Sequence, residues 1–235
     1  SNLGNVFRKL HEYERAVDQY KRAIQIKPNY YEALNGMGLA LTELKNYNKA
    51  KNILKQAIKV NPKFAEAYNN LGNVYKEIQD FHKAISYYRK VLRIDKKLAG
   101  VHNNLGNVLS LVGDNKNAIY HQKMAVSLDT NSVAFLQSLL FYLNYSPNMS
   151  AEEIFEYYKL YDRRFGLPHK DKWKPFAQPK VPNKKLKIGY VSPDFKKHSI
   201  ERFLLPTLAY HNHDKFEIFA FAELENEDMV SQEYK

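Results

Sequence analysis

Apolar and small residues return at a fixed spacing of 34 residues through the first half of the chain. The glycines of this pattern are Gly4, Gly38, Gly72 and Gly106, and the alanines are Ala16, Ala50, Ala84 and Ala118. Within each period the apolar positions follow helical spacing, which predicts two antiparallel helices joined by a short turn. A repeat of this length is typical of a solenoid, in which each helix pair buries its apolar face only against a neighbour.

The copy from Ala65 to Leu98 shows the pattern most clearly. Its expected apolar positions are Tyr68, Leu71, Gly72, Tyr75 and Ile78 on the first helix, and Ala84, Ile85, Tyr88, Val91 and Leu92 on the second. Glycine inside a helix costs about 1 kcal/mol relative to alanine, so its recurrence predicts that the two helices approach closely there. Pro28 and Pro62 are expected to end the first two pairs, because proline cannot continue a helix.

This pattern resembles the tetratricopeptide repeat over residues 1–131, as about four units of which the first is truncated. The resemblance implies an all-α, right-handed superhelix whose concave face is built from the first helix of each unit. It is specific for fold and not for function, because such arrays occur in adaptors and enzymes alike.

Asparagines flank the repeated glycine on the first helix of three units. They are Asn2, Asn5, Asn70, Asn73, Asn104 and Asn107. Each amide offers two donors and an acceptor, so a row of them can bind the backbone of an extended peptide in a groove. The second unit interrupts the row with Gly36 and Leu39, and solvated surface amides are the alternative interpretation. A clamp for charged C-terminal tails is not expected, because the neighbouring row lacks lysine and arginine: Ser1, Asn35, Asn69 and Asn103.

Residues 132–166 continue with two helices that we expect to cap the solenoid. Ser150 and Glu153 form a capping-box pattern, and Gly166 is expected to end the second helix. The expected core stripe of that helix is Ile154, Tyr158, Tyr161 and Phe165. Residues 167–185 contain four prolines and many lysines, which predicts an extended connector that holds a domain boundary.

Residues 186–235 read as the beginning of a second, α/β domain. Apolar runs at 186–191 and 216–222 predict strands, and a helix at about 200–210 is expected between them, capped by Ser199 and interrupted by Pro206. Loops after the carboxyl ends of parallel strands gather functional groups, and residues 192–199 form that loop. The loop has no glycine-rich phosphate fingerprint.

The order of array, cap, connector and the segment GYVSPDF followed by HS resembles the O-linked N-acetylglucosamine transferase and SPINDLY family. The resemblance implies that the second domain begins a GT-B, Rossmann-like catalytic domain. It also implies inverting, metal-independent transfer of N-acetylglucosamine from UDP-GlcNAc to Ser or Thr of proteins held by the array, with no cofactor. His198 matches the family's active-site histidine, with an acid–base or positioning role. Because the donor-binding lobe lies beyond these residues, we expect no transfer by the chain as given.

Composition narrows these expectations only a little. The net charge of +11 is spread over the repeat helices and the connector, so we expect no nucleic-acid partner, and no run is long enough for a membrane span. The absence of cysteine favours the cytoplasm, with the nucleus as a further location. His211 and His213 are expected to be surface residues rather than a metal pair. Two alternatives stay open: a non-catalytic peptide-binding scaffold, and an O-fucosyltransferase of the same architecture.

Overall fold

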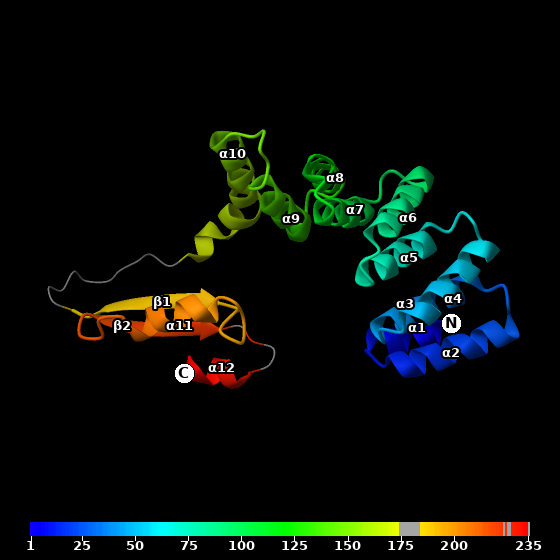
Figure 1. Cartoon of the computed structure of the whole chain (residues 1–235), viewed down its shortest axis with the longest axis horizontal. Helices are drawn as coiled ribbons and strands as arrows, with labels where there is room; N and C mark the ends of the chain where they lie inside the picture. Colours follow the sequence, from blue (N-terminus) through cyan, green and yellow to red (C-terminus); the bar gives the residue numbers. More distant parts are fainter. Residues whose placement is uncertain (174–183, 223, 225–226, 235) are drawn as a thin grey trace. The chain divides into compact units, whose positions relative to one another are not determined.

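A computed structural model describes residues 1–173, 184–222, 224 and 227–234. The chain divides into two compact units, Ser1–Trp173 and Lys174–Lys235. The first unit is helical, as Figure 1 shows. It begins with four antiparallel helix pairs. These pairs are α1 (Asn2–Lys9) with α2 (Tyr13–Ile26), α3 (Tyr31–Glu43) with α4 (Tyr47–Val60), α5 (Ala65–Glu77) with α6 (Phe81–Ile94), and α7 (Ala99–Leu111) with α8 (Asn115–Leu128). We call α1, α3, α5 and α7 the first helices and their partners the second helices.

The repeated glycine lies where the two helices of a pair come closest, as predicted. A Cβ atom added to Gly72 would lie 2.7 Å from Cε1 of Tyr88, and Gly4 has the same relation to Tyr20. The facing side chain is therefore four residues beyond the repeated alanine. The alanines themselves are fully buried.

The ends of the helices follow local backbone chemistry. Pro28 and Pro62 each come one residue after the C-cap of α2 and α4, and both helices end there as predicted. The turn inside each pair contains one residue with positive φ, namely His11, Lys45, Gln79 and Gly113. Glycine adopts positive φ most easily, and of the four pairs only the fourth has glycine at this turn position.

A continuous apolar core runs through the four pairs. Leu71, Tyr75, Tyr88 and Val91 of the central copy are buried in it, as expected. Ile78 is 37% exposed, so the expectation that it belongs to the apolar face was wrong. The reason is its place as the C-cap residue of α5, beyond the last helical turn that packs on α6.

Two further helices, α9 (Val133–Leu143) and α10 (Ala151–Tyr161), follow the array and share a second core with α8. The predicted capping box is present: Ser150 Oγ accepts from Glu153 N at 3.2 Å, and Ser150 N donates to Glu153 Oε2 at 2.8 Å. Tyr158 was wrongly placed in the core stripe. It is 42% exposed and accepts a hydrogen bond from Asn144, because the phase of α10 turns Tyr157 inward instead.

The end of this unit differs from the expected extended connector. A π-helical turn covers Asp162–Gly166, so the backbone stays helical up to Gly166. A 3-10 helix then covers Leu167–Lys172, with Pro168 in its first turn, where proline needs no backbone donor. Residues 174–183 of the connector lie outside the described residues. No helix in the described part of the chain is long and apolar enough to cross a membrane.

The second unit contains a β-α-β arrangement. Strands β1 (Leu186–Ser192) and β2 (Phe216–Ala222) pair in parallel, with Leu186 opposite Phe216. Helix α11 (Glu201–Ala209) connects them, and α12 (Met229–Glu233) follows. The strands match the predicted runs, but two details of α11 do not.

Both corrections to α11 concern its local hydrogen bonds. Its N-cap is Ile200 and has no side-chain cap, so Ser199 does not cap it. Pro206 lies inside the helix without interrupting it. A proline removes one backbone donor, and here Thr207 Oγ adds a hydrogen bond to the Phe203 carbonyl at 2.6 Å.

Candidate functional site

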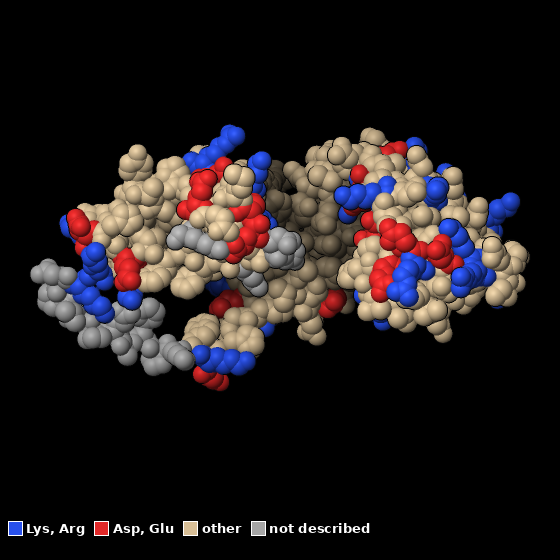
Figure 2. Space-filling model, turned by 90° about the horizontal axis from the view of Figure 1, so that it is seen from below, with Lys and Arg blue, Asp and Glu red and all other residues tan. Residues whose placement is uncertain are grey.

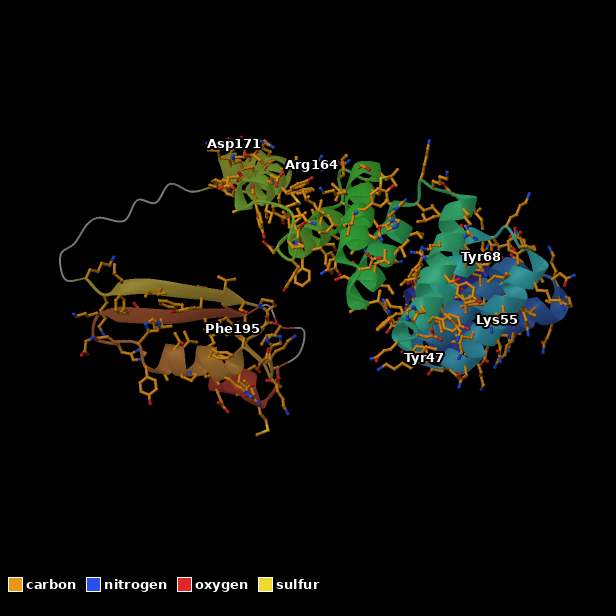
Figure 3. All side chains as sticks on the ribbon, turned by 45° about the horizontal axis from the view of Figure 1, so that its top comes forward. Tyr47, Lys55, Tyr68, Arg164, Asp171 and Phe195 are labelled. Carbon is orange, nitrogen blue, oxygen red and sulfur yellow. The ribbon has the colours of Figure 1, made fainter. Side chains whose placement is uncertain are left out.

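A cleft of about 420 Å³ opens on the first helices of the second, third and fourth pairs. Successive first helices contact one another along the array, so they form one continuous face. The cleft is lined by Leu39, Thr42, Glu43, Lys45, Tyr47, Asn70, Asn73, Lys76, Glu77 and Asn104. We call it the amide cleft. Tyr47, one of its lining residues, is labelled in Figure 3. It brings together three predicted asparagines; Asn2, Asn5 and Asn107 do not line it.

The asparagine that follows the repeated glycine has a partner inside its own pair. Asn73 Oδ1 accepts from the hydroxyl of Tyr88 at 2.6 Å, and Asn5 accepts from Tyr20 in the same way. In the fourth pair Asn107 accepts from Gln122 Nε2 at 2.7 Å. These three asparagines therefore satisfy buried donors through their carbonyl oxygens, and none of these bonds uses their NH₂ groups.

The interruption in the second pair follows from the same contact. There Leu39 stands in place of the asparagine, and Leu54 stands in place of the tyrosine. Leu54 is fully buried and has no polar group, so no acceptor is needed opposite it. The asparagine is thus present where the second helix carries a donor and absent where it does not.

Asparagines of neighbouring pairs also bond to one another. Asn70 Nδ2 donates to Asn35 Oδ1 at 2.8 Å, and Asn104 Nδ2 donates to Asn69 Oδ1 at 3.4 Å. Asn70 is only 8% exposed, so one face of its amide is turned into the array. The sequence analysis did not assign a role to Asn35 or Asn69. Their spacing of 34 residues was the available signal.

The charged groups of the amide cleft are balanced. Lys76 Nζ lies 3.1 Å from Glu77 Oε1, and Lys45 and Glu43 bring one further charge of each sign. The asparagine carbonyls and NH₂ groups are therefore the polar groups that distinguish this surface. Such a surface suits a neutral, hydrogen-bonding ligand better than a charged one.

His198 lies in the loop after β1, which two contacts hold in place. Phe195, which Figure 3 labels, is 1% exposed. Its ring packs edge-on against the ring of Tyr234. Asp228 Oδ2 accepts from the backbone N–H of Lys197 at 2.8 Å. This hydrogen bond is the largest cause of the lowered pKa of Asp228, followed by the one from Ser231. The sequence analysis missed Asp228, whose signal was a capping-box pattern with Ser231.

The His198 side chain is exposed, and its Nδ1 accepts from the backbone N–H of Ile200 at 3.4 Å. A neutral imidazole that accepts at Nδ1 carries its proton on Nε2. In this form Nε2 can donate a hydrogen bond to a ligand. Acting as a base through Nε2 requires the other tautomer, which gives up the contact with Ile200.

His211 and His213 lie in the turn before β2, where the side chain of His211 is half-buried and that of His213 is exposed. His211 Nε2 lies 2.7 Å from the hydroxyl of Tyr190, which occupies that ring nitrogen. Within the described residues, no group of three or more His, Cys, Asp or Glu side chains could hold a metal ion.

Comparison with known sequences identifies the repeats and a distant relationship. The chain matches the tetratricopeptide-repeat family over residues 4–45, 38–79 and 65–98. It is 28% identical over 112 residues to a SPINDLY protein of Solanum lycopersicum, named as a probable UDP-N-acetylglucosamine–peptide N-acetylglucosaminyltransferase. The match covers 47% of this chain and only 12% of the tomato protein.

Solved structures show the same fold. The MamA structure has a TM-score of 0.62 at 22% identity and covers 74% of this chain and 99% of that one. A mutant O-GlcNAc transferase of Thermobaculum terrenum has a TM-score of 0.59 at 22% identity, covering 86% of this chain and 39% of that one.

A third structure is that of YrrB, described as a TPR protein with an unusual peptide-binding site. It has a TM-score of 0.55 at 18% identity and covers 73% of this chain and 90% of that one. Residues 4–98 are therefore tetratricopeptide repeats, in a chain that is distantly similar over part of its length to SPINDLY N-acetylglucosaminyltransferases.

Proposed function

We propose that this chain is the substrate-binding part of a protein O-glycosyltransferase, which transfers N-acetylglucosamine from UDP-GlcNAc to Ser or Thr of proteins. The observation that carries the proposal is the amide cleft, in an array that is similar to SPINDLY sequences. The match to the O-GlcNAc transferase structure adds support. It covers 86% of the chain. The helical unit accounts for only 173 of the 235 residues, so the matched part is longer than the helical unit.

The amide cleft binds an extended segment of a protein substrate through its backbone. Asn70, Asn73 and Asn104 present side-chain amides to the peptide N–H and C=O groups, which occur in every sequence. Each hydrogen bond contributes about 0.5–1.5 kcal/mol. Recognition is therefore weak, additive and tolerant of sequence, as suits an enzyme with many protein substrates.

Peptide binding is tested by fluorescence anisotropy with a labelled, unstructured peptide rich in Ser and Thr. We expect Asn70→Ala and Asn104→Ala each to weaken binding about two- to tenfold, as the loss of one hydrogen bond predicts. Asn35→Ala is the matched control, because it breaks the same Asn70–Asn35 bond but removes no group that lines the cleft. Equal losses in Asn35→Ala and Asn70→Ala would show that stability of the array, not contact with peptide, is the cause.

His198 acts at the reacting hydroxyl in this proposal. An imidazole can position a hydroxyl through Nε2–H, or accept its proton in the other tautomer, and such a group contributes about 10²–10⁴-fold in rate. The test uses the protein that contains this chain, with radiolabelled UDP-GlcNAc and an acceptor peptide. We expect transfer that is lost in His198→Ala and retained in His213→Ala, a histidine outside the loop.

A peptide-binding scaffold is the second candidate, and the MamA and YrrB matches favour it because both cover most of a repeat protein's length. A scaffold binds the labelled peptide but transfers no sugar from UDP-GlcNAc or GDP-fucose. Transfer from GDP-fucose alone would instead assign the O-fucosyltransferase alternative.

A further inference from the structure

A second cleft, of about 360 Å³, lies between α6 and the turn that joins α7 to α8. It is lined by His82, Ile85, Ser86, Arg89, Lys90, Arg93, Leu109, Val112 and Asp114, and we call it the basic cleft. It shares no residue with the amide cleft. Its volume is within the range of about 300–1,000 Å³ that is usual for ligand sites.

The basic cleft carries an excess of positive charge. Arg89, Lys90 and Arg93 are exposed and lie along one side of α6. None of the three takes part in an ion pair among the described residues. Lys90 lies 5.0 Å above the ring of Tyr87, a contact that leaves its charge in place.

The one carboxylate of the basic cleft is already engaged. Asp114 is the N-cap of α8, and its two oxygens accept from the backbone N–H and the side-chain NH₂ of Asn117, at 3.3 and 2.8 Å. Figure 2 shows Lys and Arg side chains (blue) interspersed with Asp and Glu side chains (red) on the face that it presents. Among the residues that line the basic cleft, three cations therefore stand against one carboxylate.

The floor of the basic cleft is apolar. Ile85 and Leu109 are buried beneath it, and Val112 is 38% exposed at its edge. Arginine binds carboxylates in a bidentate manner and is enriched in protein interfaces. A ligand that matches the floor and the rim needs an apolar side chain flanked by carboxylates.

We propose that the basic cleft docks an acidic segment of a partner protein, in which aspartates or glutamates flank an apolar side chain. Charge complementarity selects a peptide with carboxylates. A single nucleic-acid strand is less suitable, because such strands stack on exposed aromatic side chains and no Phe, Tyr or Trp lines this cleft. The docking site lies outside the proposed substrate-binding cleft, so the array can hold a partner and a substrate together.

The test uses the full chain and a fluorescein-labelled peptide of glutamates and leucines, measured by anisotropy at low salt. We expect binding that weakens with rising salt, because exposed charges are screened. The Arg89→Gln/Arg93→Gln variant is expected to bind about tenfold more weakly, from the loss of two exposed charge contacts. A control peptide with glutamine in place of each glutamate lacks the carboxylates. It is expected to bind the unsubstituted chain about tenfold more weakly than the acidic peptide does.

The repeat supplies a matched control. Lys55 and Lys59 stand 34 residues before Arg89 and Arg93, at the same positions of α4, and do not line the basic cleft (Figure 3 labels Lys55). Lys55→Gln/Lys59→Gln makes the same change in net charge and is expected to keep the affinity. An equal loss in this control overturns the proposal, since net charge would then explain the binding.

Two further outcomes decide against the proposal. The first is no measurable binding of the acidic peptide at low salt. The second is tighter binding of a single-stranded RNA oligonucleotide that the Arg89→Gln/Arg93→Gln variant loses, which would assign the cleft to nucleic acid. Asn70→Ala is expected to weaken binding of the acidic peptide less than Arg89→Gln/Arg93→Gln does, so that failure here and failure of the proposed substrate cleft are separate results.

Discussion

The close contact between Gly72 and Tyr88 makes a sharp prediction about the helix pair. In the Gly72→Ala variant, the new methyl group would lie 2.7, 2.9 and 3.2 Å from three carbons of the Tyr88 ring. The ring is fully buried and its hydroxyl is bonded to Asn73 at 2.6 Å, so it has no open space to move into. We therefore expect the variant to be less stable, although alanine is the better helix former.

The magnitude follows from three contributions. Overpacking a filled core costs about 1–3 kcal/mol. Displacing the ring weakens its hydrogen bond, which adds about 0.5–1.5 kcal/mol. Alanine in place of glycine returns about 1 kcal/mol through helix propensity. The free energy of unfolding should thus fall by about 0.5–3.5 kcal/mol.

Urea unfolding followed by far-UV circular dichroism measures this change, because the helical unit contributes most of the helical signal. Gly100→Ala is the matched control: Gly100 lies in the first turn of α7, and a Cβ there meets nothing within 4 Å. That variant should be unchanged or stabilised by up to about 1 kcal/mol. If Gly72→Ala shifts the transition in the same direction as Gly100→Ala, the steric explanation of the repeated glycine is refuted.

Three other predictions concern stability. Tyr88→Phe should lower the free energy of unfolding by about 0.5–1.5 kcal/mol in the same urea assay, and by less once Asn73 is changed to leucine. Ser150→Ala should cost about 1 kcal/mol and speed amide exchange in the first turn of α10; unchanged exchange would contradict the capping box. Burial, followed by the nearby charges of His102 and Arg89, lowers the pKa of His121 from 6.5 to about 4. The unfolded chain therefore takes up this proton at a higher pH than the folded chain does. The free energy of unfolding should be constant above pH 6.5 and should fall as the pH falls toward 4, and the fall should be smaller in His121→Gln.

The 34-residue period predicted most of the helical unit, because each repeated residue has a local physical role. Glycine allows close approach and proline ends the second helix, and both can be recognised without knowledge of neighbours. The strands of the second unit were also visible as short apolar runs. Tyr158 was misplaced because spacings of three and four along α10 are compatible with two helical faces, and the contact with α9 chooses between them.

The hydrogen bonds of the site were less accessible to sequence reasoning. Asn73 and Tyr88 are 15 residues apart on different helices, and Asn70 and Asn35 belong to different pairs. Neither separation corresponds to a local rule, so the sequence analysis interpreted the asparagines as peptide-binding groups, or alternatively as solvated surface amides, and did not predict these bonds. Asp228 accepts a hydrogen bond from the backbone N–H of Lys197 in the loop of His198, and the two residues are 31 apart in the sequence. The sequence signal for Asp228 was a capping-box pattern with Ser231.

The matched choice of side chains within a pair limits how such an array can be rebuilt by exchanging its parts. Leu39 and Leu54 occupy in the second pair the positions that Asn73 and Tyr88, which are bonded to each other, occupy in the third. A recombinant that joins α3 to α6 would set a buried phenol against a leucine and leave its hydroxyl without an acceptor. Exchanging whole helix pairs keeps both partners together, so the pair, rather than the single helix, is the smallest unit that can be exchanged without loss.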